Sequence, residues 1–354
     1  MSTEAPTIAS SFHKLPKITK NNKILLLTHT DMDGSGPVIF LKSIFKDIDV
    51  EHCPNALMSK TIKQKATDAD VAKQYDTIIV CDISCTENDA EIINKYKKIK
   101  NLILLDHHIT ATALNKYSWA CVEPNLLEDT YRNNYLYGIN KKPSRSSGTS
   151  LLFDYLTYCE LIQNIPNIHL AEELNFFIAG YDTWDWAELF DKDIRFQNLD
   201  TLFETYGFTE FENAYIKRLS NPEETELFNE TDHLLLRIAE TKRQVHTDKI
   251  RRTMSTGNVK FNDEYLTFVF CFSTEYLQNT FDVMKEDYPD SDLYIVDYGN
   301  GLSFRAIKEN INIAEIVKPL GGGGHPGAGG LSISFEDRKE LIENILHTSL
   351  FFDE

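Results

Sequence analysis

Long apolar runs are missing from this sequence. No uninterrupted stretch approaches the roughly 18 apolar residues that a membrane-spanning helix needs. The first twenty residues also lack the apolar core of a secretory signal. Solenoid repeats and low-complexity tracts are absent too, apart from one glycine-rich run near residue 325. We therefore expect a protein that neither crosses nor enters a membrane.

Cysteine is sparse, and its spacing forms no pairs. The six cysteines are scattered, and although Cys81 and Cys85 flank Asp82, no second pair completes a zinc site. This usage favours a reduced, cytoplasmic protein.

Basic charge is also in short supply. Lys and Arg number 36 against 54 Asp and Glu, which gives a net charge of -18. A chain this acidic has no basic field to attract long duplex nucleic acid, whose tight binding depends on counterion release. If the substrate is a phosphate ester, its charge must be met by metals or by a few placed basic residues. The balance therefore favours short substrates.

Three short apolar segments define the predicted core of the first half of the chain. Residues 24–27, 76–81 and 102–105 are apolar throughout or nearly so, as strands buried on both faces are. Helical stretches separate them, which predicts an α/β fold with a parallel sheet and right-handed crossovers. Each strand is followed by Asp or His, so these polar side chains should gather at one edge of the sheet.

The rest of the 354 residues suggests two further parts. Residues 187–258 look helical and end in an amphipathic segment from about 223 to 254, which suits a connector and could also serve a homodimer. A second pattern of strands and helices starts after it. We therefore predict an N-terminal domain over 1–186, a helical connector over 187–258 and a smaller α/β domain over 259–354.

Acidic and imidazole side chains at the predicted strand ends and at one helix end form a candidate metal site. Four carboxylates and two imidazoles exceed one tetrahedral zinc site but balance two divalent cations. A shared carboxylate could bridge metals about 3.5–4 Å apart, and a shared hydroxide would be the nucleophile. Mixed nitrogen and oxygen ligands suit manganese, cobalt or iron better than magnesium. The set is His29, Asp31, Asp33, Asp82, His107 and Asp182.

Each member has a plainer interpretation when taken alone. The run from His29 to Asp33 could be a solvated turn, and Asp82 could be a helix N-cap. Asp182 says little by itself, and Asp185 competes for the same role. The metal hypothesis depends on the same kind of ending recurring on three successive strands.

The glycine-rich run forms a second constellation. Residues 321–330 hold seven of the chain's 16 glycines together with His325. Such a run lets backbone N–H groups converge on an anion, and the histidine can donate to a phosphate oxygen. A flexible hinge is the alternative, although a hinge needs no histidine. Arg305 lies in an alternating strand and is either a surface residue or a bidentate phosphate ligand.

Several of these residues together resemble a known family. His29-Thr30-Asp31-Met32-Asp33-Gly34, Asp82, Asp106-His107-His108 and Asp182 resemble the successive motifs of the DHH phosphoesterase superfamily. Residues 301–305 and 321–330 resemble its DHH-associated C-terminal substrate-binding domain. The resemblance covers about 23–186 and 260–335. It is greatest to the branch of oligoribonucleases (nano-RNases) and cyclic-nucleotide phosphodiesterases.

The resemblance implies a role for each matching residue. His29, Asp31 and Asp82 would hold one manganese, and Asp33, Asp82, His107 and Asp182 the other. His108 would contact the scissile phosphate, and Asp106 would orient the histidines. The substrate's terminal phosphate or nucleotide would be held across an interdomain cleft by Arg305, Gly322, Gly323, Gly324 and His325.

The expected activity is therefore hydrolysis of short single-stranded oligonucleotides to nucleoside monophosphates by a hydroxide that two metals activate. A small-nucleotide substrate is the alternative within the same site: 3′-phosphoadenosine phosphate, a cyclic or linear dinucleotide, or pyrophosphate. A single-strand exonuclease would need a basic track with stacking aromatics, which the net charge does not suggest. A nucleotide-binding sensor would keep the site without cleaving.

Overall fold

The computed structural model describes residues 6–130, 143–261, 264–308, 311–334, 336 and 339. Contacts divide the chain into two compact units, an N-terminal unit of residues 1–236 and a C-terminal unit of residues 237–354. The predicted domain boundaries at 186 and 258 remain a prediction.

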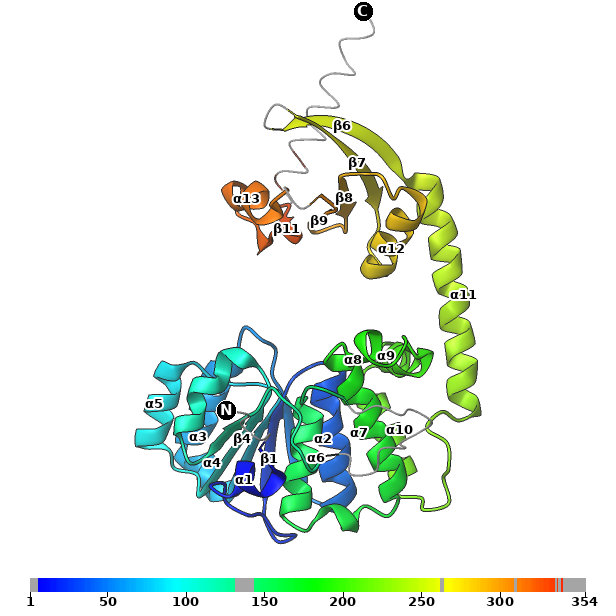
Figure 1. Cartoon of the computed structure of the whole chain (residues 1–354). Helices are drawn as coiled ribbons and strands as arrows, with labels where there is room; N and C mark the ends of the chain where they lie inside the picture. The colour runs from blue at the N-terminus through cyan, green and yellow to red at the C-terminus, as the bar shows by residue number, and fades with distance from the viewer. Residues whose placement is uncertain are drawn as a thin grey trace, which may run out of the picture. The chain divides into compact units, whose positions relative to one another are not determined.

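The N-terminal unit is a parallel sheet covered by helices on both faces (Figure 1). Its strands lie in the order β2-β1-β3-β4-β5, and every neighbouring pair is parallel. The strands are β1 (Ile24–Thr28), β2 (Ile48–His52), β3 (Thr77–Cys81), β4 (Asn101–Asp106) and β5 (Ala120–Val122). This confirms the predicted fold class, and β2 forms two residues earlier than the predicted strand at 50–54.

Two apolar clusters hold this sheet between its helix layers. Alternate residues of β1 face opposite layers: Leu26 belongs to the first cluster, while Leu25 and Leu27 belong to the second. The first layer contains α1 (Ile8–Phe12), α2 (Met32–Ile44), α6 (Gly148–Tyr158), α7 (Ile168–Asp182), α9 (Ile194–Tyr206) and α10 (Phe208–Leu219). The second layer contains α3 (Met58–Thr67), α4 (Ala69–Gln74), α5 (Glu87–Tyr96) and the 3₁₀ helix η1 (Ile109–Lys116).

The chain changes direction across the sheet at β1. From β1 it moves to β2 on one side, and it then returns to β3 on the other. Ligand sites of open α/β sheets lie beyond the carboxyl ends of the strands at such a switch point. The residues that follow β1 and β3 are therefore placed where a site is expected.

Short elements complete the N-terminal unit. They are the 3₁₀ helix η3 (Ile162–Asn164) and α8 (Asp185–Glu188).

The long amphipathic helix α11 (Glu230–Thr253) begins about seven residues later than predicted. Residues 221–229 form turns instead, because the side chain of Asn167 donates to the carbonyls of Asn221 and Glu224. No helix in the described part of the chain is both long and apolar enough to cross a bilayer.

The C-terminal unit contains a mixed sheet in the order β10-β11-β9-β8-β7-β6, in which only β7 and β8 run parallel. Its strands are β6 (Ser255–Phe261), β7 (Glu264–Phe272), β8 (Leu293–Asp297), β9 (Gly301–Ala306), β10 (Gly323–His325) and β11 (Ala328–Ser332). Its helices after α11 are α12 (Leu277–Asp287), α13 (Ile313–Val317) and the 3₁₀ helix η4 (Lys318–Leu320). Of the helix predicted to close the chain after residue 335, residues 336 and 339 are described, and both are helical; the rest lies outside the described residues.

Two details of this unit differ from the prediction. Residues 255–258, placed at the end of the connector, form strand β6 together with residues 259–261, at the edge of the sheet. The glycine-rich run is a two-stranded hairpin, because β10 and β11 pair around Pro326 and Gly327. Glycine lacks a side chain that would clash there: a Cβ on Gly324 would lie 2.4 Å from the Ala328 carbonyl oxygen.

Close contact between α2 and α6 yields a stability prediction. A Cβ added at Gly36 would lie 2.1 Å from the Thr149 hydroxyl, which is itself fixed by donating to the Asp33 carbonyl at 2.6 Å. Gly36→Ala should therefore lower the free energy of unfolding by about 1–3 kcal/mol, measured by urea unfolding. Lys42→Ala on the exposed side of α2 should stay within about 0.5 kcal/mol, and equal stability of the two variants would contradict the packing described.

Candidate metal centre

The loop after β1 brings its three candidate ligands to the start of α2. Asp31 is the N-cap of this helix, and its Oδ1 accepts from the Gly34 N–H at 2.9 Å. Its Oδ2 lies 2.5 Å from Nδ1 of His29. This hydrogen bond raises the pKa of His29. Asp33, the second residue of α2, is buried.

Asp33 is held by the N-terminus of α6. Its two side-chain oxygens accept from the N–H groups of Gly148 at 2.6 Å and Thr149 at 3.0 Å. The unpaired N–H groups at a helix N-terminus favour negative charge. Gly148 has to be small, because a Cβ there would lie 2.4 Å from the Asp82 Cβ. Sequence reasoning did not foresee this support, for which the serine-rich turn before α6 is the only signal.

Asp82 follows β3 and lies at the centre of the site. Its backbone has φ 60°, a left-handed conformation that aspartate tolerates better than most residues. The side chain is 3 % exposed, and its Oδ2 accepts no hydrogen bond from the described residues. Burial, together with the charges of Asp33 and Asp31, raises the pKa of Asp82 well above the ordinary aspartate value. A buried carboxylate with an unused oxygen is the arrangement that a bound cation would stabilise.

The strand β4 ends in Asp106, whose carboxylate accepts hydrogen bonds from the two histidines that follow it. Asp106 is fully buried, and its Oδ1 accepts from the backbone N–H of His107 at 2.9 Å and from Nδ1 of His108 at 2.7 Å. The His108 bond raises the pKa of that imidazole, whose side chain remains 54 % exposed. Asp106 therefore fixes the backbone that carries His107 and the ring of His108.

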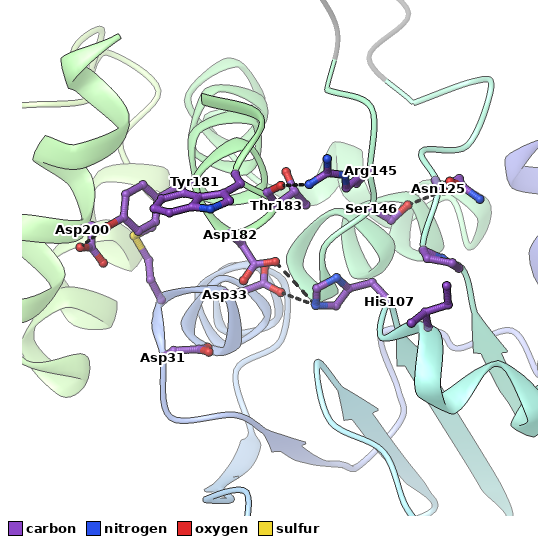
Figure 2. A pocket seen from close by; sticks show the side chains of 14 residues that line it. Asp31, Asp33, His107, Asn125, Arg145, Ser146, Tyr181, Asp182, Thr183 and Asp200 are labelled. Atoms are coloured by element: carbon purple, nitrogen blue, oxygen red, sulfur yellow. Dashed lines mark hydrogen bonds and ion pairs between the residues drawn. The ribbon is translucent and has the colours of Figure 1, made fainter. Parts of the chain in front are cut away.

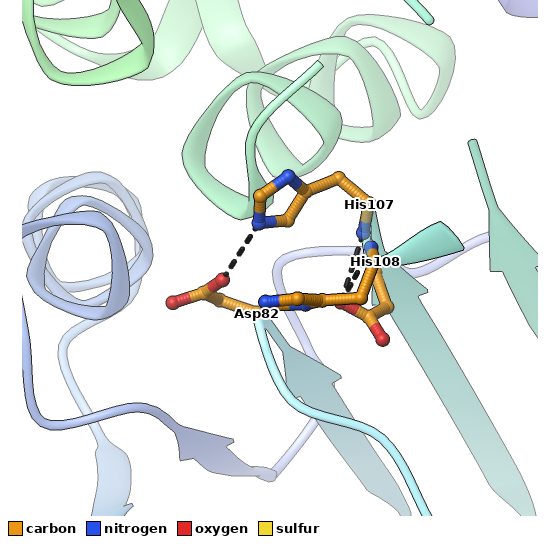
Figure 3. A group of neighbouring side chains, drawn as sticks. Asp82, His107 and His108 are labelled. Carbon is orange, nitrogen blue, oxygen red and sulfur yellow. Dashed lines mark hydrogen bonds and ion pairs between the residues drawn. The ribbon is translucent and has the colours of Figure 1, made fainter. Parts of the chain in front are cut away.

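The imidazole of His107 lies close to three carboxylates. Its Nε2 lies 3.2 Å from Asp82, 3.6 Å from Asp182 and 4.0 Å from Asp33 (Figures 2 and 3). Asp182 ends α7, and burial with the charge of Asp33 raises its pKa well above the ordinary value. Three overlapping groups of potential ligands result among the described residues, and the ligand atoms within each lie no more than 4.8 Å apart. Two of them are His29, Asp31 and Asp82, and Asp33, His107 and Asp182. The third, Asp82, Asp106, His107 and His108, shares a residue with each of the other two.

Asp185, the competitor of Asp182, has a different position. It is fully buried, and its carboxylate accepts from Ser144, through the backbone N–H at 2.5 Å and the hydroxyl at 2.7 Å. It also accepts from the Arg145 N–H at 3.3 Å. Asp185 thus fixes the segment before α6, and the geometry places only Asp182 beside the other candidate ligands.

A pocket of about 850 Å³ opens beside these ligands. Figure 2 shows Asp33 and Asp182 directed at His107, with Arg145 donating to the Thr183 carbonyl oxygen at 2.6 Å on the neighbouring wall. The pocket residues that the sequence reasoning missed come from the segment before α6, from the last turn of α7 and from the turn after it. They include Asn125, Arg145, Tyr181 and Trp184.

Arg305 and the glycine hairpin share one face of the C-terminal sheet. Arg305 pairs with Ala328 across β9 and β11, and Ala328 pairs with His325 across β11 and β10. Directly paired residues have side chains on the same face, so Arg305 and His325 point to one side with only the Ala328 methyl between them. At two strand spacings their backbones are about 10 Å apart. The Arg305 guanidinium stacks on Phe281 at 4.6 Å.

Known proteins resemble this chain over most of its length. Residues 23–180 match the DHH family, N-terminal domain. Oligoribonuclease NrnB of Bacillus subtilis (strain 168) is 27 % identical over 317 residues, which cover 88 % of this chain and 73 % of that protein. Among solved structures, the pGpG-specific phosphodiesterase PggH from Vibrio cholerae has a TM-score of 0.48 at 18 % identity, covering 94 % of this chain and 100 % of the other.

A second solved structure, RecJ of Thermus thermophilus in complex with Mn²⁺, has a TM-score of 0.46 at 12 % identity, covering 92 % of this chain and 51 % of the other. The segment 23–180 contains the ligand-bearing ends of β1, β3 and β4. Residues 23–180 thus carry the N-terminal domain of the DHH family, as the motifs predicted, and the chain is a metal-dependent phosphoesterase.

The clustered carboxylates predict a stability that depends on pH and metal. Because the pKa values of Asp82 and Asp182 are raised in the folded chain, folding binds protons above the unfolded aspartate value of about 3.9. The metal-free protein should therefore lose stability as the pH rises from about 4 to 7. Manganese at one hundred times its dissociation constant should add about 2.7 kcal/mol at neutral pH.

Thermal unfolding with manganese or a chelator at several pH values measures both effects. Asp82→Asn should flatten the pH dependence and weaken the metal effect, while the exposed-site control Asp47→Asn should keep both. A melting temperature that neither manganese nor the chelator changes would contradict a metal centre here.

The different positions of Asp182 and Asp185 lead to opposite expectations. Asp185→Ala leaves the Ser144 and Arg145 donors without their acceptor and should cost about 1–3 kcal/mol of stability. Asp182→Ala removes a repelled carboxylate and should preserve stability but weaken manganese binding. Urea unfolding and calorimetric titration separate the two. Loss of metal binding in Asp185→Ala alone would reverse the assignment.

Proposed function

We propose that this protein is a manganese-dependent phosphodiesterase that hydrolyses short single-stranded oligonucleotides to nucleoside monophosphates. The observation that carries the proposal is the pair of ligand groups that meet at Asp82 and His107, 3.2 Å apart. The oligoribonuclease relative, which aligns with 88 % of this chain, supports the substrate class. The net charge of -18 agrees with short substrates.

The donor set fits two divalent cations. Asp82 supplies one oxygen near His107 and a second, without a hydrogen bond, 3.8 Å from His29 Nδ1, so it can serve both groups. In the proposal His29, Asp31 and Asp82 hold one ion, and Asp33, Asp82, His107 and Asp182 hold the other. Imidazole ligands favour manganese over magnesium. When bound, the ions would activate a water for attack and neutralise phosphate charge.

The side chains around the ions would position and stabilise the substrate. His108 is half-exposed, and its bond to Asp106 favours the protonated imidazole, which leaves Nε2–H to donate to a phosphate oxygen. The amides of Gly148 and Thr149 keep Asp33 in place. Asp106 is a positioning residue, because the described hydrogen bonds to its carboxylate all come from the two histidines.

The C-terminal unit would bind the other end of the substrate. Arg305 and His325 lie on one sheet face with glycines at 323 and 330 and only a methyl group between them, which leaves room for a phosphate. We include Gly322, Gly323 and Gly324 in this subsite. The stacking of Arg305 on Phe281 would hold its guanidinium ready for a bidentate contact.

Two further parts of the proposal concern the surroundings of the chain. All six cysteines are free, and five of them are buried, which supports the reduced environment of the cytoplasm. Leu234, Ile238 and Val245 are exposed along α11 and support a homodimer.

Manganese-supported digestion of end-labelled RNA and DNA of two to twelve nucleotides tests the proposed activity. Dinucleotides to pentanucleotides should be cleaved fastest, with nucleoside monophosphates as products. Asp82→Asn should lower kcat/KM by at least about a hundredfold, since even residues behind the ligands contribute up to that much in metal sites. Arg305→Ala should mainly raise KM. Asp47→Asn, an exposed aspartate on the same unit, should behave like the wild type.

Other outcomes of this assay would redirect the proposal. Rates on 3′-phosphoadenosine phosphate, cyclic and linear dinucleotides and pyrophosphate, measured side by side, would show a small-nucleotide enzyme if one of these compounds were preferred. Nucleotide binding with no product in manganese would indicate a sensor. Hydrolysis that Asp82→Asn leaves unchanged would refute the site.

A further inference from the structure

Trp184 exposes its indole ring in the pocket that contains the metal-ligand candidates. It is 56 % exposed, whereas the other two tryptophans, Trp119 and Trp186, are 2 % and 6 % exposed. The same pocket is lined by Asp31, Asp33, His107 and Asp182. Trp184 lies two residues after Asp182 in the chain. The exposed ring is therefore close to the place where the phosphate would be bound.

The backbone of Trp184 has a conformation that a bulky residue seldom adopts. Its φ of 66° and ψ of 2° are left-handed, and it follows Thr183, the C-cap of α7, where glycine is the common choice. A large side chain costs free energy in this conformation. Because the indole stays more than half exposed, its burial offsets little of this free-energy cost. Folding alone thus gives no reason for tryptophan at this position.

The Trp184 ring is held in place by its neighbours. The Trp184 N–H donates to the Tyr181 carbonyl at 3.1 Å, and the Trp184 carbonyl accepts from the Ala187 N–H at 3.0 Å. Trp186 packs against the ring at 5.6 Å between centroids, and Tyr181 stacks on Trp186 at 5.8 Å. Three aromatic rings thus form one supported group, and only the outermost ring is mainly exposed.

A polar side chain, the amide of Asn125, also lines this pocket. Asn125 is exposed there, and its side-chain amide forms no hydrogen bond with the described part of the chain. Its backbone carbonyl accepts from Ser146 at 2.8 Å, and Asn125 bridges to Arg145, which fixes the loop that carries it. A flat aromatic face and a free amide that line one pocket are the pairing that recognises unstacked nucleobases, by stacking and by hydrogen bonds to the base edge.

We propose that Trp184 is the stacking platform for the nucleobase of the substrate nucleotide next to the scissile phosphate, and that Asn125 meets the edge of that base. The inference rests on the proposed function, because it assumes that a nucleotide is bound in this pocket. It adds a base-binding subsite to a centre otherwise made of phosphate and metal contacts. Base stacking on an aromatic residue tolerates any base, so the platform would favour nucleotides over other phosphate esters.

The left-handed backbone permits a clean test by glycine substitution. Trp184→Gly removes the ring and suits the local conformation, so its melting temperature should equal or exceed that of the wild type. For the wild type, a dinucleotide should be a better substrate than the same compound made abasic at one of its two positions, by about five- to a hundredfold in kcat/KM. Trp184→Gly should lose this preference and Trp184→Phe should retain most of it.

A matched control and an independent readout complete the test. Tyr96, on α5, is 52 % exposed, and Tyr96→Ala should leave the preference for the base unchanged. A preference that persists in Trp184→Gly at both positions would overturn the platform. Adenosine monophosphate with manganese should quench tryptophan fluorescence in the wild type and in Tyr96→Ala, but not in Trp184→Gly.

The fluorescence readout needs no turnover, so it separates the two proposals. Quenching that depends on Trp184, in a protein that hydrolyses no dinucleotide, would support the platform and refute the proposed reaction. Hydrolysis without any quenching, and with no base preference, would refute the platform alone.

Discussion

The constraint on which the N-terminal unit depends is the burial of like charges at one point. Asp82 and Asp33 are 3 % and 2 % exposed, Asp106 is fully buried, and Asp182 lies beside them at the end of α7. An ionised carboxylate loses much of its hydration on burial, and carboxylates this close repel one another. The folded chain can carry the cluster only with compensation from hydrogen bonds, helix N-termini, protons or cations.

The fold supplies part of that compensation and leaves part of it to a ligand. Asp31 caps α2, Asp33 accepts two amides of α6, and Asp106 accepts from both histidines. Asp82 and Asp106 each keep one buried oxygen that accepts nothing from the described residues. The other oxygen of Asp106 accepts three hydrogen bonds from the two histidines, whereas the other oxygen of Asp82 lies 3.2 Å from His107 Nε2. Asp82 lies between two of the ligand groups, at the switch point between β1 and β3. This distribution is why we regard the cluster as a metal centre rather than as a set of helix caps.

Much of this arrangement could be predicted from the sequence, since it follows from strand ends. Apolar runs that end in Asp or His locate β1, β3 and β4, and parallel strands bring those ends to one edge. The family resemblance singled out Asp182, and the geometry supports that choice over Asp185. The assignments of individual metal ligands and of substrate contacts remain predictions, because the similarity to known proteins concerns the family and its class of chemistry.

Other features depended on tertiary contacts that periodicity cannot show. The support of Asp33 by Gly148 joins residues 115 apart in the sequence. The glycine-rich run looked like a loop because glycine has low strand propensity, yet β10 and β11 pair as a hairpin, and β11 also pairs with β9. β6 is the edge strand of the described sheet, paired with β7, and carries polar residues that resemble a linker. Trp184 escaped notice because its left-handed backbone has no sequence signal when the residue is not glycine.

A count of manganese ions per chain, with their magnetic coupling, tests the proposed centre most directly. Calorimetric titration and electron paramagnetic resonance of the intact chain should show two ions per chain whose spectra are coupled, since one carboxylate is proposed to serve both. Asp82→Asn should remove the coupling, while Asp47→Asn should preserve it. A single uncoupled ion per chain, or none, would contradict a two-metal centre built on Asp82.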